Sequence, residues 1–76
     1  MKAREFWDLS PGDQIKFVND LPGENVLLII DKVHKQGEYE GYTYRAIAIA
    51  GDDIGTTFIA SVPIYWTLVS KYEDGQ

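Results

Sequence analysis

Residues 15–31, "IKFVNDLPGENVLLIID", are the most informative segment for the fold of this 76-residue chain. Its first residues alternate between apolar and polar side chains, as a short strand with one wet face does. Pro22 and Gly23 then mark a turn. The five apolar residues from Val26 to Ile30 follow without alternation, and such a run predicts a β-strand that needs cover on both faces.

The rest of the sequence predicts four more elements. Residues 39–50, "YEGYTYRAIAIA", are expected to form a hairpin with residues 26–35 across a reversal at Gly37. After the turn "GDDIG", residues 56–62 favour another strand, and Pro63 interrupts the chain before a last strand. Residues 2–9, "KAREFWDL", predict about two helical turns that "SPGD" ends, with Phe6, Leu9 and, in one interpretation, Trp7 facing inward.

Five short strands joined by turns predict an all-β fold, because closing them into a small five-stranded barrel removes the unpaired sheet edges. A short N-terminal helix precedes the strands in this prediction. A chain of 76 residues is expected to form one domain, residues 1–76. Residues 1–10 are its N-terminal segment, and residues 74–76 are expected to be a loose tail.

Two segments resemble the SH3-like barrel family. The first, "LSPGDQIKF" from Leu9, is similar to the Leu-x-x-Gly-Asp-x-Ile opening of such barrels. The second, "FIASVPIYWTLV" from Phe58, has a strand, a Pro-x-Tyr step and a final strand in the family's order. The resemblance spans roughly a third of the chain and implies an SH3-like barrel. Because the Ala-Leu-Tyr-Asp-Tyr stretch and the acidic loop of peptide-binding SH3 domains are missing, binding of Pro-rich peptides is not implied.

The alternating stretch "AIAIA" raises the question of which face of the hairpin lies inside. Bulky β-branched side chains fill a small barrel well, so Ile47 and Ile49 are predicted to face the interior. The opposite face then needs cover from the N-terminal segment, through Phe6 and Trp7, or from a second copy of the chain. The predicted interface of a homodimer consists of Ala46, Ala48 and Ala50.

Composition narrows the classes of function. The net charge of −5 disfavours non-specific binding to nucleic acid or anionic lipid and favours a neutral or basic protein partner. The chain has no cysteine, and neither a signal-peptide pattern nor a membrane-length apolar run occurs in it. We therefore expect a cytoplasmic protein without disulfides.

The residues offer little for catalysis or metal binding. His34 is the single histidine, which excludes a multi-His metal site, and an exposed hairpin position explains it better than a catalytic role. Asp52 and Asp53 suit a turn better than a cation site, and Glu38 and Glu40 suit a solvated hairpin tip. The prediction is a protein that is not an enzyme and needs no cofactor or metal.

The aromatic residues are the most informative feature, because Tyr and Trp are enriched at protein interfaces. The leading hypothesis is a protein-binding module or small acidic inhibitor, of the kind that phages and mobile elements encode. The alternative is a binder of nucleic acid or a small nucleotide on the tyrosine-bearing hairpin. Ordinary core packing of the same aromatics stays open as a third interpretation. The predicted binding residues are Tyr42, Tyr44, Arg45, Tyr65 and Trp66.

Overall fold

A computed structural model describes residues 1–19, 23–35 and 41–72 of the chain. Within these ranges the chain forms one five-residue α-helix, five strands and one turn of 3₁₀-helix. In chain order these elements are α1 (Ala3–Trp7), β1 (Gln14–Phe17), β2 (Val26–Lys35), β3 (Gly41–Ala50), β4 (Thr57–Ala60), η1 (Pro63–Tyr65) and β5 (Trp66–Ser70). The predicted all-β fold with a short N-terminal helix is confirmed.

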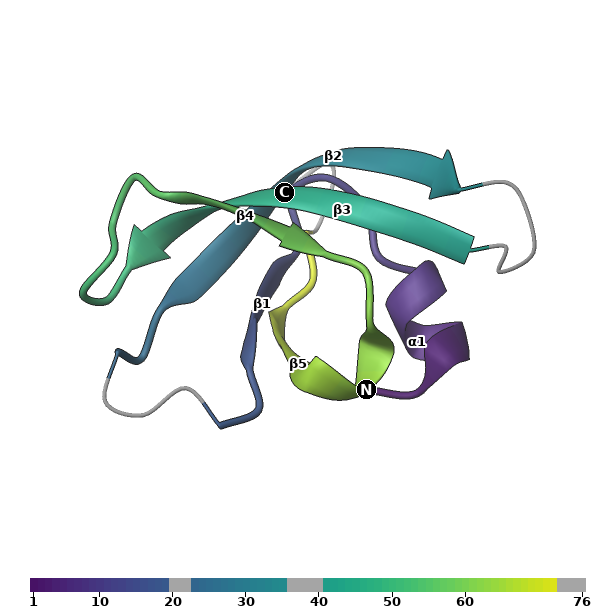
Figure 1. Cartoon of the computed structure of the whole chain (residues 1–76), viewed down its shortest axis with the longest axis horizontal. Helices are drawn as coiled ribbons and strands as arrows, with labels where there is room; N and C mark the ends of the chain where they lie inside the picture. The colour runs from purple at the N-terminus through teal and green to yellow at the C-terminus, as the bar shows by residue number, and fades with distance from the viewer. Residues whose placement is uncertain (20–22, 36–40, 73–76) are drawn as a thin grey trace.

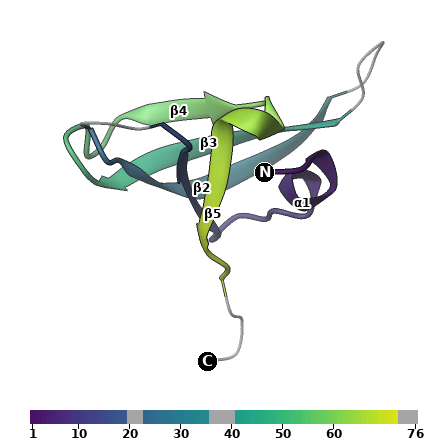
Figure 2. The same ribbon diagram turned by 90° about the horizontal axis from the view of Figure 1, so that it is seen from below.

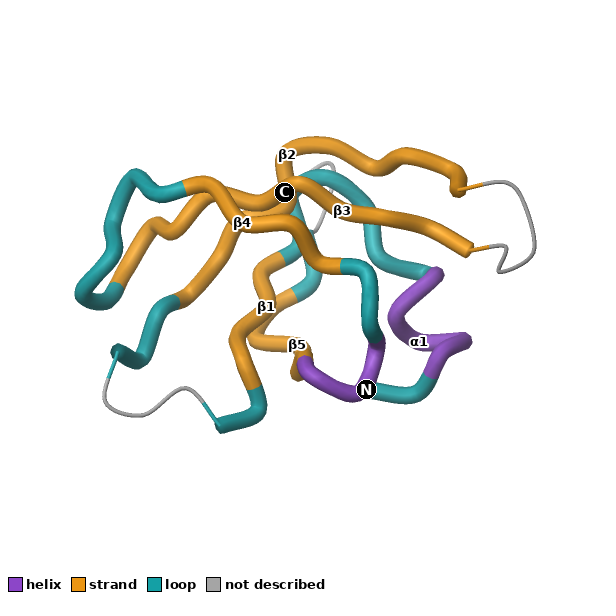
Figure 3. The backbone as a smooth tube through the Cα atoms, in the orientation of Figure 1, coloured by secondary structure: helices purple, strands orange, loops and turns teal. Residues whose placement is uncertain are grey.

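All five strands form a single antiparallel sheet in the order β4-β3-β2-β1-β5. The long β2–β3 hairpin is the central part of this sheet, and β1 and β5 cross beneath the hairpin at a steep angle (Figure 1). Helix α1 lies on the same side of the hairpin as β1 and β5, as the tube in Figure 3 also shows. The sheet thus curls around one interior in the manner of a small barrel, and the hairpin prediction is correct.

The core lies between the curled sheet and the N-terminal segment. Phe6 at the end of α1 and Leu9 just after it are both buried, as predicted, whereas Trp7 is partly exposed. Trp7 packs across Gly41, where an added Cβ would come within 3.0 Å of the indole Nε1 atom. The buried apolar residues are Phe6, Leu9, Ile15, Leu27, Ile29, Tyr44, Ala46, Ala48, Ala60 and Trp66.

A β-bulge explains how one strand carries the run of five apolar residues. Leu27 and Ile29 pair with Ala48 and Ala46, and all four side chains are buried. The register then shifts, so that Ile30 is left as an extra, exposed residue. A bulge of this kind bends the strand and increases its twist, which helps to close the sheet.

The prediction of which hairpin face lies inside was wrong. Ala46 and Ala48 are buried in the core, whereas Ile47 is half-buried and Ile49 is exposed. Large side chains from α1, β1 and β2 already fill the narrow interior, so the alanines on β3 leave room for them.

The predicted dimer interface is corrected by the same finding. Ala46 and Ala48 are covered within the chain itself, so they offer no area to a second copy. Ala50 is exposed, at the end of β3. Phe6 of the N-terminal segment belongs to the same buried cluster as Ala46 and Ala48, in agreement with the first of the two predicted sources of cover.

Some predictions concern residues outside the described ranges. These are the reversal at Gly37, the hairpin tip with Glu38 and Glu40, and the loose tail at 74–76. Among the described residues, no helix is long and apolar enough to span a membrane.

Candidate functional site

The structure separates the five residues that were predicted to form one binding surface. Tyr44 and Trp66 are core residues, with exposed fractions of 0% and 3%. Tyr42 is half-buried, while Tyr65 and Arg45 are exposed. Tyr44 and Trp66 were therefore misassigned as surface residues, and the remaining three lie on different parts of the molecule.

Tyr44 is buried because the end of α1 supplies a partner for its hydroxyl group. The hydroxyl donates to the Phe6 carbonyl oxygen at 2.6 Å and lies 3.3 Å from that of Leu9. Its ring meets the ring of Phe6 edge-to-face, with 4.9 Å between centroids. Burial, followed by the nearby Tyr42, Asp13 and Asp8, raises the pKa of Tyr44 to about 12, so the hydroxyl stays a neutral donor.

Trp66 forms the floor of an exposed apolar surface at one end of the barrel. Its ring stacks on that of Phe17 at a centroid distance of 4.1 Å and an angle of 27°. Phe17 ends β1, and its outer side remains partly exposed. The buried indole therefore supports side chains that face solvent.

We call this surface the end patch, and it consists of Phe17, Val18, Ile64 and Tyr65. Together with Asn19 these residues line a pocket of about 320 Å³. Ile64 and Tyr65 are 70% and 54% exposed. Pro63 starts the turn of η1, and the Val18 amide donates to the Tyr65 carbonyl oxygen at 3.0 Å. This bond fixes the end of β1 beside η1, so the pocket is held by backbone and not only by side chains.

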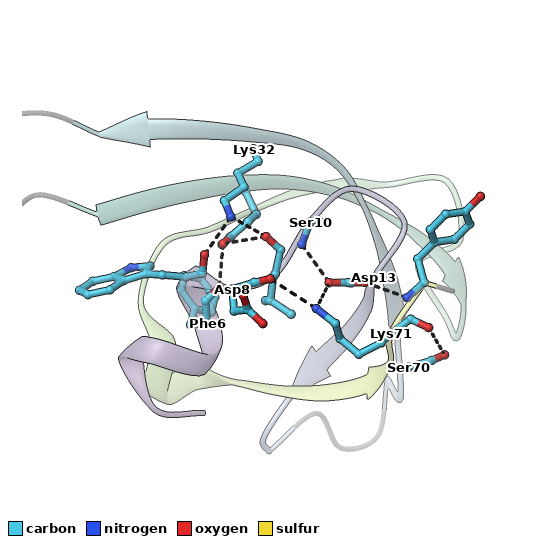
Figure 4. Close-up of polar contacts among 11 residues, drawn as sticks. Phe6, Asp8, Ser10, Asp13, Lys32, Ser70 and Lys71 are labelled. Atoms are coloured by element: carbon cyan, nitrogen blue, oxygen red, sulfur yellow. Dashed lines mark hydrogen bonds and ion pairs between the residues drawn. The ribbon is translucent and has the colours of Figure 1, made fainter. Parts of the chain in front are cut away.

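Lys32 and Tyr42 are engaged in holding α1 against the sheet. The Lys32 ammonium group donates to the carbonyl oxygens of Trp7 and Leu9 at 2.8 and 2.7 Å (Figure 4), and it lies 5.6 Å from the centre of the Tyr44 ring. The same group lies 4.4 Å from the centre of the Tyr42 ring. Carbonyls at a helix end lack partners in the helix and attract cations. Lys32 and Tyr42 therefore contribute first to the fold.

Asp13 holds the segment that follows β5 in place. Its buried carboxylate accepts from the amides of Ser10 and Tyr72 and from the ammonium group of Lys71, at 2.8 to 2.9 Å (Figure 4). Burial alone would raise the pKa of Asp13, but the bonds from Tyr72, Lys71 and Ser10 outweigh it and leave the pKa below the usual value. The group is ionised and fully used, so it is a structural carboxylate.

Gly12 makes this arrangement possible. It adopts a positive φ of 101°, and an added Cβ would lie 2.8 Å from the Tyr72 ring. A side chain at this position would meet both a strained backbone and a clash.

Asp53, in the turn at 51–55, forms hydrogen bonds that hold this turn against Asn25. Asn25 donates to the Asp53 carboxylate at 2.7 Å and accepts from the Asp53 amide at 2.9 Å. The predicted turn role of Asp53 is thus confirmed. Within the described ranges, no group of three or more His, Asp or Glu residues is arranged to hold a metal ion.

A larger hollow of about 770 Å³ runs along the outer side of α1. It is lined by Ala3, Arg4, Glu5, Trp7 and Asp8, a mixed set of opposite charges around one indole. Its lining has no built-in group that selects one ligand chemistry. The end patch is therefore the better defined candidate site.

Sequence reasoning found Tyr65 but missed Phe17, Val18 and Ile64. The sequence did contain a signal for Ile64. Pro63 directly precedes it and favours a tight turn, in which apolar side chains face outward. Phe17 and Val18 are adjacent apolar residues at the point where the alternation of β1 ends. Because successive side chains of a strand point to opposite faces, they cannot both face the interior.

Comparisons with known proteins add no relatives: no family model, no curated protein and no solved structure matches this chain.

Proposed function

We propose that this chain is a non-enzymatic protein-binding module, of the small inhibitor type, and that the end patch is its binding surface. The observation that carries the proposal is the exposure of four adjacent apolar side chains around a pocket of about 320 Å³. Exposed apolar groups that surround a pocket mark interaction sites more often than scattered surface residues do.

The chemistry of the end patch supports a protein partner. Tyr and other aromatic residues, supported by a well-packed floor, are typical of interface hot spots. Here the buried Trp66, stacked on Phe17, forms that floor, and Tyr65 offers both ring and hydroxyl. The pocket has the size to receive one apolar side chain. Since the net charge is −5, a partner with a neutral or basic surface around that side chain is favoured.

The nucleic-acid alternative has less support. It requires free cations and rings on the tyrosine-bearing hairpin. Lys32 instead donates to two carbonyl oxygens, and Tyr44 is buried against Phe6. Few groups are left there to contact phosphates and bases.

Changing Tyr65 to alanine is expected to weaken partner binding by roughly 2 kcal/mol, about 30-fold in Kd, while the melting temperature stays nearly unchanged. Tyr72→Ala is the matched control, since Tyr72 has the same side chain at a similar exposure of 63% and lies outside the end patch. A partner captured from host lysate by the wild type is then titrated against all three proteins at low and high salt.

The outcomes separate the two classes. The end patch is supported if Tyr65→Ala binds the partner more weakly, Tyr72→Ala binds it like the wild type, and the wild type still binds it at high salt. Equal affinity of the wild type and Tyr65→Ala excludes it, and binding that falls steeply with salt and vanishes on nuclease treatment favours the nucleic-acid alternative.

A further inference from the structure

The long hairpin presents a second apolar surface, away from the core. Residues that face outward on neighbouring strands are identified by the register: Leu28 pairs with Ile47, and Arg45 pairs with both Asp31 and Ile59. We call this surface the outer face, and its aliphatic residues are Leu28, Ile30, Val33, Ile47, Ile49 and Ile59.

No described segment covers the outer face. Helix α1 and strands β1 and β5 all lie on the opposite side of the hairpin, as the two views show together (Figures 1 and 2). Ile59 and Val33 are 62% and 54% exposed, and Ile30 and Ile49 are also exposed. Single exposed apolar residues are ordinary, but several on adjacent strands are typical of an interaction surface.

The charges at the centre of this surface are self-complementary. Asp31 and Arg45 are cross-strand neighbours, 3.7 Å apart, and about half of each side chain is exposed. Their charges cancel, whereas the whole chain carries −5. A two-fold axis that lies midway between the two stacked sheets, parallel to the strands and over the midpoint of this pair, brings Arg45 of one copy over Asp31 of the other, and the reverse. Lys35 lies at the end of the hairpin, away from this centre.

The residue types also distinguish the outer face from the end patch. Its apolar residues are aliphatic, as in a protein core, and interfaces of permanent homodimers resemble a core cut in half. Hot spots for other proteins are instead enriched in Tyr, Trp and Arg. Stacking two outer faces, at the usual sheet separation of about 10 Å, also gives Val26 to Ile30 the second cover that their sequence predicts.

We infer that a second copy of this chain packs on the outer face, so that the protein is a two-fold symmetric dimer of stacked sheets. The inference does not depend on the proposed function, because the end patch contributes no residue to the outer face. It places the dimer contact on the isoleucines of the hairpin and not on its alanines.

Sedimentation of the purified 76-residue chain over a range of concentrations tests this dimer. The wild type is expected to sediment as a dimer, and Ile59→Lys to raise the dissociation constant roughly tenfold or more, because a lysine enters an apolar contact. Val69→Lys is the control: Val69, on β5 at the other edge of the sheet, is also exposed, and both variants change the net charge equally.

A charge exchange tests the geometry without a large change in folding, since an exposed ion pair contributes little to stability. Asp31→Arg and Arg45→Asp each place like charges across the two-fold axis and are expected to weaken the dimer. The double variant restores opposite charges and is expected to dimerise like the wild type.

Three results would overturn the inference. They are a wild type that is monomeric at millimolar concentration, equal weakening by Ile59→Lys and Val69→Lys, and a double charge variant no stronger than the single ones. Should Ile59→Lys fail to fold by circular dichroism, the charge variants decide alone.

Discussion

Replacing Tyr44 with alanine is expected to lower the free energy of unfolding by about 3 to 5 kcal/mol, the usual cost of removing a large buried side chain. A chain of 76 residues has a total of roughly 4 to 11 kcal/mol available. The ring contact with Phe6 is lost, and the Phe6 carbonyl oxygen loses its short bond from the hydroxyl, whereas the Leu9 carbonyl oxygen keeps the Lys32 ammonium group. Chemical denaturation followed by circular dichroism measures the effect.

Two matched variants show how much of this loss of stability comes from the hydroxyl group and how much from burial of the ring. Tyr44→Phe keeps the ring and removes only the hydroxyl, so we expect a loss of about 1 kcal/mol. Tyr65→Ala removes the same side chain from an exposed position and is expected to change stability by about 0.5 kcal/mol or less. If Tyr44→Ala proved as stable as Tyr65→Ala, the packing of α1 on the hairpin would be wrong.

The hydroxyl of Tyr44 also makes a pH-dependent contribution. Its pKa is raised from 10.0 to about 12 in the folded protein, so its protonated form is favoured by folding. The corresponding stability is complete below pH 10 and is lost as the pH rises toward 12. The difference in unfolding free energy between the wild type and Tyr44→Phe should therefore shrink over that range.

The strands and turns were predictable because local sequence specifies them. Pro and Gly punctuate the chain at the ends of the strands, and β-branched runs such as Val26 to Ile30 have few alternatives to extended structure. The short helix was predictable for a similar reason, since "SPGD" cannot continue it. These features depend on neighbours in the chain and not on the tertiary fold.

The direction of the hairpin side chains was not predictable in this way. The bulge at Ile30 reverses the parity of β2, so Leu27 and Ile29 face inward before it and Lys32 faces α1 after it. A period-two pattern carries no mark of such an extra residue. Side-chain volume was equally misleading for Ala46 and Ile47, because the space left inside depends on Phe6 and Leu9 from a distant segment.

The aromatic residues illustrate the same difference at the candidate site. Tyr44 lies on a strand and is buried, whereas Tyr65 lies directly before a strand and is exposed, although the two are the same residue type. The difference lies in their partners: the Phe6 carbonyl oxygen satisfies Tyr44, whereas η1 turns Tyr65 toward solvent. Only the three-dimensional arrangement assigns the two roles.

Replacing Asp13 with asparagine is expected to cost about 2 to 3 kcal/mol at neutral pH, because hydrogen bonds to a charged group are worth more than neutral ones. Ser10 and Lys71 donate to one carboxylate oxygen and Tyr72 to the other, so the new amide group keeps an acceptor on one side and turns its own N–H donors toward the other. Lys71→Met is the control: it removes the half-exposed ammonium group alone and leaves the amides of Ser10 and Tyr72 on the carboxylate. Its cost should therefore be smaller than that of Asp13→Asn.

The response to acid distinguishes a charge effect from a packing effect at Asp13. The pKa of Asp13 is lowered in the folded protein, so its contribution to stability is present above the unfolded value near 4 and is lost as the pH falls through the folded value. The stability difference between the wild type and Asp13→Asn should therefore shrink below about pH 4. A difference that stays constant from pH 7 to pH 2 would mean that the side chain's shape, and not its charge, holds Ser10 and Tyr72 in place.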